Sequence, residues 1–235
     1  MTDISNFETR IFKGFNVDLA EVLVSLIFAA VITALSYVIG FSFHWINTVS
    51  WTEAFGTFTG YSCTYLCVRQ SEWNFPVGIL CVIVLGFFFL SINLLSSAIL
   101  QFYSIPVLIV GWIHWGNEKT KVPVVHMDIS WNMALHILGA IVTWLVLWQI
   151  TSRLGAAMAP FDSSILVLSI LAQYTMQAKK IESWWIWVLV NVISIYTYFE
   201  SGAFVLGIQY ILFIATDITG YFDWNITLKR QKIIG

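Results

Sequence analysis

Ten of the eleven lysine and arginine residues of this chain fall in alternate gaps between apolar stretches. Eight such stretches can be read from the sequence, at 20–43, 52–68, 74–92, 96–115, 132–152, 162–178, 183–199 and 203–224. If each stretch crosses a membrane once, ten basic residues share the side of both termini and only Arg153 lies on the other. Because Lys and Arg concentrate in cytoplasmic loops, the pattern predicts a polytopic membrane protein with both termini in the cytoplasm.

Composition supports this interpretation, because the chain is 59% hydrophobic and only 10% charged. A soluble protein carries about 25% charged residues. In a lipid bilayer every backbone polar group must be paired within its own segment, so each span is predicted to be a helix of about 17–25 residues. We therefore expect an all-α protein with eight transmembrane helices. The sequence has no stripe of basic residues, so a nucleic-acid partner is not expected.

Residues 1–19 precede the first span and are predicted to form an amphipathic helix on the inner membrane surface. Apolar residues such as Phe7 and Ile11 recur at helical spacing, opposite Arg10 and Lys13. Such a helix buries its apolar face at the boundary of head groups and acyl chains.

The spans fall into two similar groups of three, residues 52–115 and 162–224, in which like residues recur 108–110 positions apart. The matched pairs are Arg69 with Lys179, Glu72 with Glu182, Gln101 with Gln209, and Gly111 with Gly220. Both groups begin outside and end inside, so the span at 132–152 is needed as a linker that carries the chain back. The predicted architecture is two parallel three-helix repeats joined by a linker helix (3+1+3), with 20–43 as an extra N-terminal helix and 225–235 as a cytoplasmic tail. Parallel repeats of this kind occur in transporters, whose substrate site lies near the midplane between the repeats.

Polar residues within a span are costly in hydrocarbon and therefore indicate function. Trp184, Asn191 and Tyr198 are spaced by seven, so they share one helix face. This face presents two aromatic planes and one amide, which can donate and accept hydrogen bonds. The three residues are suited to a ligand with a flat ring and polar substituents.

Four glutamines are further candidates. Gln173 and Gln177 are four apart and hence co-facial, while Gln101 and Gln209 lie well inside their spans. Their amides are suited to hydrogen bonding with ligand hydroxyl groups. Buried amides also hold transmembrane helices together, at about 0.6–2 kcal/mol per contact, so both roles stay open for each residue.

Trp184 and Trp185 lie near the inner interface, where tryptophans commonly anchor a helix. Trp184 shares the face of Asn191, whereas Trp185 points elsewhere on an ideal helix. Asp217 is the one carboxylate deep in a span, and it is a candidate either for a proton or cation site or for a structural partner. No metal-binding or ATP-binding motif is present, so no metal or cofactor is expected.

Residues 173–191 (QYTMQAKKIESWWIWVLVN), followed by 195–199 (IYTYF), resemble the signature region of the PnuC family of bacterial vitamin transporters. The likeness covers essentially the whole chain. It implies a fold similar to the SWEET sugar transporters, a homotrimer and a place in the bacterial inner membrane. The site residues implied by the resemblance are Trp184 and, second to it, Trp185 for ring stacking, with Asn191, Gln173, Gln101 and Gln209 bonding the ribose and carboxamide of the substrate.

The function implied by the resemblance is uptake of nicotinamide riboside, a precursor of NAD, by facilitated diffusion with alternating access and trapping by a cytoplasmic kinase. Family members also carry thiamine or riboflavin, and proton-coupled symport remains an alternative. An intramembrane enzyme would need a serine paired with a histidine at matching depth, and only His136 is centrally placed. A membrane scaffold would have no need of the shared face of Trp184, Asn191 and Tyr198. The chain is therefore expected not to be an enzyme.

Overall fold

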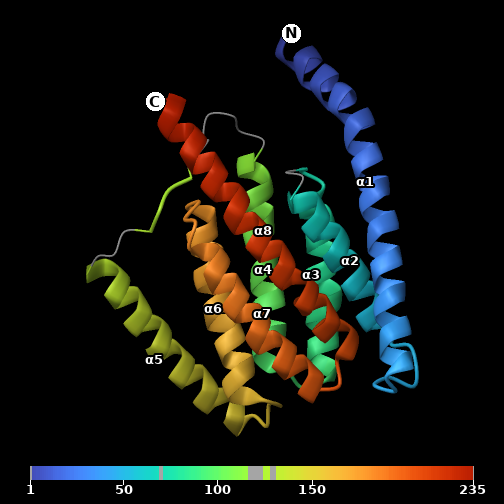
Figure 1. Cartoon of the computed structure of the whole chain (residues 1–235), viewed down its shortest axis with the longest axis vertical. Coiled ribbons are helices and arrows are strands. Elements are labelled where there is room, and N and C mark those ends of the chain that lie inside the picture. Colours follow the sequence, from blue (N-terminus) through green and yellow to red (C-terminus); the bar gives the residue numbers. More distant parts are fainter. Residues whose placement is uncertain (1, 69–70, 116–123, 128–130, 235) are drawn as a thin grey trace.

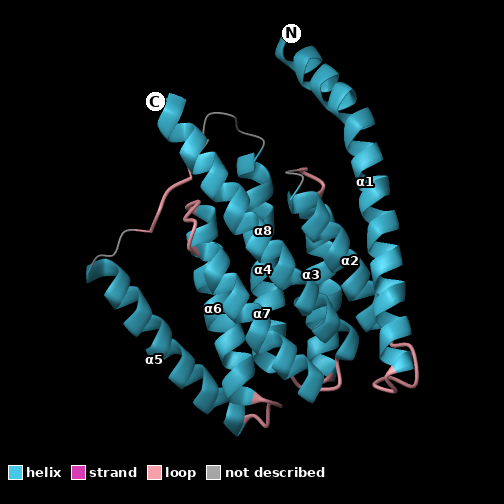
Figure 2. Cartoon of the chain, viewed as in Figure 1, coloured by secondary structure: helices cyan, strands magenta, loops and turns pink. Residues whose placement is uncertain are grey.

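The computed structural model describes residues 2–68, 71–115, 124–127 and 131–234, and every regular element in them is an α-helix (Figure 1, Figure 2). The helices are α1 (Thr2–Ser42), α2 (Trp51–Val68), α3 (Asn74–Ser91), α4 (Leu95–Trp115), α5 (Trp131–Arg153), α6 (Ala159–Gln177), α7 (Ser183–Glu200) and α8 (Phe204–Ile234). The predicted all-α fold is confirmed, and each predicted span corresponds to one helix. The largest differences are at α1 and α8, which extend well beyond the predicted spans.

The first helix, α1, runs without a break from Thr2 to Ser42. The structure therefore has no turn between the predicted surface segment 1–19 and the predicted span 20–43. The side chains of residues 1–19 lie outside the described part of the chain, so the amphipathic surface helix stays a prediction. At the other terminus, α8 continues to Ile234 and makes most of the predicted tail helical.

Five segments of the described chain are long and apolar enough to cross a membrane: Ala20–Ser42, Asn74–Ser91, Leu95–Trp112, Ala134–Arg153 and Phe204–Gln231. Helices α2, α6 and α7 are more polar because their buried faces carry hydroxyl and amide groups. Many of these hydroxyls are satisfied within the helix. Thr59, Thr175 and Thr197 each donate to the carbonyl four residues earlier, at 2.8–2.9 Å. These three hydroxyl groups are therefore paired without any contact outside their own helix, as a bundle interior in a membrane requires.

The helices form one bundle that carries both termini at the same end, which we call the termini end (Figure 1). Helix α3 packs against α2 and α4, and α7 packs against α6 and α8. These two groups of three meet where α4 contacts α6 and where α2 contacts α8. Helix α1 lies against α2 and α8 at one edge, and α5 lies against α6 at the opposite edge (Figure 1).

Away from the termini end, a buried carboxylate of each group caps a helix of the other group. Glu53, in the first turn of α2, accepts hydrogen bonds from the backbone N–H groups of Val205 (3.0 Å) and Leu206 (3.2 Å) at the start of α8. The first N–H groups of a helix have no partner within that helix, and the helix dipole favours negative charge there. Glu53 therefore fixes the start of α8 against α2.

Asp162, in the first turn of α6, makes the equivalent contact with the start of α4. Its carboxylate accepts hydrogen bonds from the backbone N–H groups of Ser96 (2.7 Å) and Ser97 (3.0 Å), and from the hydroxyl of Ser97. Each residue of this contact is 109 positions from its counterpart in the first one. The counterparts are Glu53 and Asp162, Ser96 and Val205, and Ser97 and Leu206.

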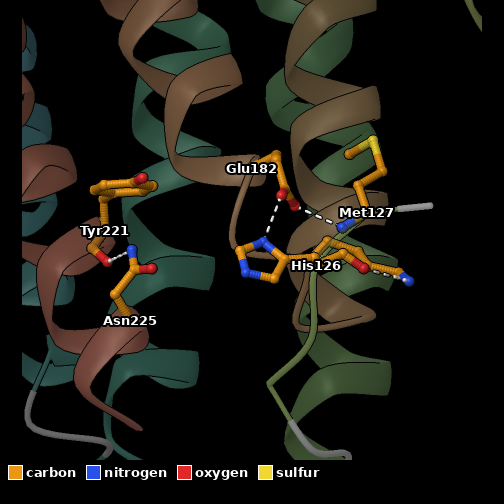
Figure 3. Close-up of polar contacts among 6 residues, drawn as sticks. His126, Met127, Glu182, Tyr221 and Asn225 are labelled. Atoms are coloured by element: carbon orange, nitrogen blue, oxygen red, sulfur yellow. Dashed lines mark hydrogen bonds and ion pairs between the residues drawn. The ribbon is translucent and has the colours of Figure 1, made fainter. Parts of the chain in front are cut away.

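At the termini end, the segment before α5 is held against the loop between α6 and α7 (Figure 3). Glu182 accepts a hydrogen bond from the backbone N–H of Met127 (2.7 Å) and lies 2.9 Å from His126 Nδ1, and Ile181 N–H donates to the Val125 carbonyl (3.0 Å). Burial raises the pKa of Glu182, but hydrogen bonding to His126 and to backbone N–H groups outweighs it and lowers the pKa below its usual value. The contact therefore stabilises the fold above the pKa of an unfolded glutamate, and this stabilisation is lost as the pH falls through the lowered folded pKa.

Candidate ligand-binding site

Helix α7 meets α8 through three contacts that follow one face of each helix. The contacts join Tyr198 to Tyr210 (ring centroids 4.9 Å apart), Asn191 Nδ2 to Asp217 Oδ2 (2.5 Å) and Trp184 to Trp224 (ring centroids 5.3 Å apart). The residues on α8 are spaced by seven, as are those on α7, so both sets run straight along their helices. The three residues of α7 thus face the same neighbour, as their spacing predicts.

The indole of Trp184 packs directly onto the backbone of α8. A Cβ atom at Gly220 would lie 2.5 Å from ring atoms of Trp184, so a larger residue there would force the indole away. Gly220 follows Asp217 by three residues, which places both on one face of α8. The indole therefore lies about one helical turn from the Asp217 carboxylate.

Asn191 and Asp217 form a buried polar pair between the two helices. Asn191 is 3% exposed and lies in the middle of α7, while Asp217 is 7% exposed. A side-chain amide has two donor hydrogens and an acceptor oxygen, and a carboxylate only accepts. The contact therefore uses one donor hydrogen of Asn191 and leaves its second donor hydrogen and its amide oxygen available.

Four further buried polar atoms of α6 and α7 have no hydrogen-bond partner among the described residues. They are Gln173 Oε1 on α6, and Ser183 Oγ, Trp184 Nε1 and Ser194 Oγ on α7. Buried polar groups in proteins are normally paired with protein, water or ligand atoms. Two hydroxyls, an amide oxygen and an indole N–H of α6 and α7 are thus available for hydrogen bonds to water or a ligand.

Gln101 and Gln209 lie nearer the end opposite the termini. Gln209 is buried about 12 Å along α8 from Asp217 and donates from Nε2 to the Thr57 carbonyl of α2 at 3.0 Å. This contact joins the two groups of helices, which is the structural role left open for the glutamines. Gln101 is buried on α4. The structure does not bring Gln209 together with the pair of Asn191 and Asp217.

The two remaining candidates stand apart as well. Trp185 is 53% exposed and packs its ring 5.2 Å from that of Tyr221, on the outside of the bundle. The side chain of Gln177 lies outside the described part of the chain. The two adjacent tryptophans therefore differ in environment: Trp184 faces the interior of the bundle, and Trp185 faces its outside.

The sequence interpretation assigned no partner to Asp217, although a signal was present. Tyr210, Asp217 and Trp224 repeat at the same spacing of seven as Trp184, Asn191 and Tyr198 on the preceding helix. Two consecutive antiparallel helices with matched spacings place these residues opposite one another in reverse order.

Amide, indole and carboxylate groups in the interior of a bundle of membrane-capable helices are typical of membrane transporters. The chain belongs to the family described as "Nicotinamide mononucleotide transporter", whose model matches residues 50–226.

Relatives with named substrates are similar over most of their length. The nicotinamide riboside transporter PnuC of Escherichia coli (strain K12) is 28% identical, over 78% of this chain and 88% of the relative. The riboflavin/roseoflavin transporter RibM of Streptomyces davaonensis is 26% identical, over 80% and 95%. A crystal structure of the vitamin B3 transporter PnuC aligns with a TM-score of 0.67 at 21% identity, over 88% of this chain and 92% of that one, and so has the same fold.

Proposed function

We propose that this transporter carries nicotinamide riboside into the cell. The observation that carries the proposal is the arrangement of Trp184, Asn191 and Asp217, which combines an indole, an oriented amide and a carboxylate between α7 and α8. Nicotinamide riboside has a flat cationic ring, a carboxamide and ribose hydroxyl groups. A cation over an indole is stabilised by about 2 kcal/mol when desolvated, and amides pair with the polar substituents.

The charges of the interior favour the riboside over its phosphorylated form. Among the described residues, the buried charged side chains are Glu53, Asp162 and Asp217, all acidic. A phosphate group would meet no buried cation there and would be repelled by Asp217. A second candidate is riboflavin, which is supported by the similarity to RibM and by its flat ring system.

The architecture that we infer is 3+1+3, with residues 52–115 and 162–224 as parallel repeats, 132–152 as linker and α1 as an extra helix. Two observations support it. The capping contacts of Glu53 and Asp162 are related by one offset of 109 positions in all their residues. The family match begins at residue 50, after α1, and runs to residue 226. On this basis all eight helices cross the membrane.

In the proposed orientation both termini lie in the cytoplasm and the protein resides in the bacterial inner membrane. The basic residues support this, since ten of eleven fall in the termini or the loops of one side. The homotrimer is carried over from the family resemblance. The exposed apolar side chains of α5, among them Leu135, Leu138 and Val142, supply a surface that lipid or a neighbouring subunit would cover.

Transport is proposed to be facilitated diffusion by alternating access, because the sequence has no ATP-binding loop. In the inferred orientation the caps of Glu53 and Asp162 lie at the outer end and hold the two repeats together there. Opening toward the outside would have to break both caps. A transporter without coupling runs downhill, so phosphorylation of the riboside in the cytoplasm would set the direction of net uptake.

Trp184→Ala should weaken binding of nicotinamide riboside by about 1–3 kcal/mol, the range measured for stacking of a base on an aromatic side chain. The adjacent Trp185 is the matched control, because it is the same residue type but lies exposed on the outside of the bundle. Calorimetric titration of both purified variants gives the comparison. Equal losses in the two variants, or none at Trp184, would remove the indole from the proposed site.

Counterflow in proteoliposomes tests the transport proposal. Vesicles loaded with unlabelled nicotinamide riboside should accumulate the labelled compound transiently, without any imposed pH gradient, and protein-free vesicles should not. Unlabelled nicotinamide mononucleotide should compete poorly. Counterflow with riboflavin and none with nicotinamide riboside would establish the second candidate instead, and a strict requirement for a pH gradient would indicate proton-coupled symport.

A further inference from the structure

Asp217 differs from the other buried acids of the described chain in how its charge is compensated. Glu53 accepts two backbone N–H groups at the start of α8, and Asp162 accepts two at the start of α4 and a hydroxyl. Both sit where a helix dipole favours negative charge. Asp217 lies 13 residues into α8, about 20 Å from its first residue, and its hydrogen bond among the described residues comes from Asn191.

A carboxylate in the interior of a membrane protein is costly and is normally paired with a cation or kept for function. No described lysine, arginine or histidine forms an ion pair with Asp217, as the ion pair of the described chain joins His126 and Glu182 at the termini end. The amide of Asn191 supplies one hydrogen bond and no positive charge. The negative charge of the Asp217 carboxylate is therefore not balanced by a positive charge among the described residues.

The position of Asp217 relates it to both other members of the proposed site. It contacts Asn191 directly, and it shares a face of α8 with Gly220, onto which the indole of Trp184 packs. A flat ring that stacks on Trp184 and bonds to Asn191 would therefore lie next to the carboxylate. Asp217 is buried within the helix bundle, so an opposite charge beside it acts more strongly than in water.

We propose that Asp217 is a specificity-determining residue, whose carboxylate selects a substrate with a positively charged ring over one of the same shape with a neutral ring. This inference rests on the proposed function, because it requires that the natural substrate is a cation. In this proposal each residue makes a different interaction with the substrate: Trp184 stacks on the flat ring, Asn191 forms hydrogen bonds, and Asp217 attracts the positive charge. The residue is then neither a proton carrier nor only a structural partner of Asn191.

The test is a thermodynamic cycle between one charge on the protein and one on the ligand. The ligands are nicotinamide riboside and its 1,4-dihydro form, which keeps the ribose and carboxamide but has a neutral ring. Calorimetric titration of the wild-type protein should show tighter binding of the cation, by at least about tenfold. In Asp217→Asn, which keeps an oxygen that accepts the Asn191 hydrogen bond, the preference should fall below about twofold, through weaker binding of the cation.

Two variants serve as controls. Asp217→Glu keeps the charge and should keep the preference, and Asp223→Asn removes an exposed carboxylate from the same helix and should leave both affinities unchanged. An Asp217→Asn protein whose two affinities both change by one common factor would overturn the charge role of Asp217. So would a wild-type protein that binds both ligands equally, a result that needs no folded variant. If the wild-type protein binds neither ligand, the proposed function itself fails.

Discussion

Asn191→Leu should weaken binding of nicotinamide riboside at least about 100-fold and leave the protein folded. Leucine has a similar volume but can neither donate nor accept hydrogen bonds. The polar groups of the ligand that form hydrogen bonds with Asn191 would be buried without partners, which costs about 1–3 kcal/mol of binding free energy for each group. Two such groups amount to about 3 kcal/mol, which corresponds to a factor above 100 in the dissociation constant.

The control for this variant is Asn191→Gln, which keeps the amide but moves it by one methylene. Its affinity should lie between those of the wild type and of Asn191→Leu. Gel filtration and the melting temperature establish folding, and a modest decrease in melting temperature is expected because Asp217 loses its amide donor. Wild-type affinity in folded Asn191→Leu would show that the site does not include this residue.

Asp162→Ala should lower the free energy of unfolding by about 3 kcal/mol, with little direct effect on the ligand. Alanine would leave the N–H groups of Ser96 and Ser97 and the Ser97 hydroxyl without their acceptor in a buried place. Each unpaired buried donor costs about 1–3 kcal/mol, part of which relaxation and water recover. For a protein of this size, the melting temperature of the purified protein should decrease by about 6–12 °C.

Three variants bracket this result. Asp162→Asn keeps an acceptor without the charge and should cost about 1 kcal/mol. Glu53→Ala removes the corresponding cap of α8 and should destabilise less than Asp162→Ala, because no hydroxyl is involved. Asp223→Asn, exposed on α8, should leave the melting temperature unchanged. An Asp162→Ala protein that melts like the wild type would contradict the capping role.

The helices were predictable because the apolar stretches and the alternating basic residues act locally along the chain. The continuation of α1 through residues 1–19 and of α8 to Ile234 was not. Hydropathy marks the part of a helix that lies in hydrocarbon. It does not show where the helix ends once polar residues continue it outside the membrane. Helices α2, α6 and α7 begin and end within three residues of the predicted spans, although hydroxyls such as those of Thr59 and Thr175 lower their hydropathy.

The sequence predicted which residues of the candidate site share one face of α7, but it did not predict their contacts with other helices. The spacing of Trp184, Asn191 and Tyr198 indicates one face, but the partner of that face depends on how α7 and α8 pack. The glutamines illustrate the same limit, since only the packed structure gives Gln209 its partner in Thr57. The capping roles of Glu53 and Asp162 were missed because an acid in the first turn of a helix is common. Their separation of 109 equals that of Gly111 and Gly220, which was the available signal.

A calorimetric titration of the purified wild-type protein with nicotinamide riboside tests the proposed substrate directly. We expect saturable binding to one site per chain, with no comparable heat from nicotinamide mononucleotide. The absence of saturable binding of the riboside to folded protein, or tighter binding of the mononucleotide, would contradict the assignment of nicotinamide riboside as the substrate.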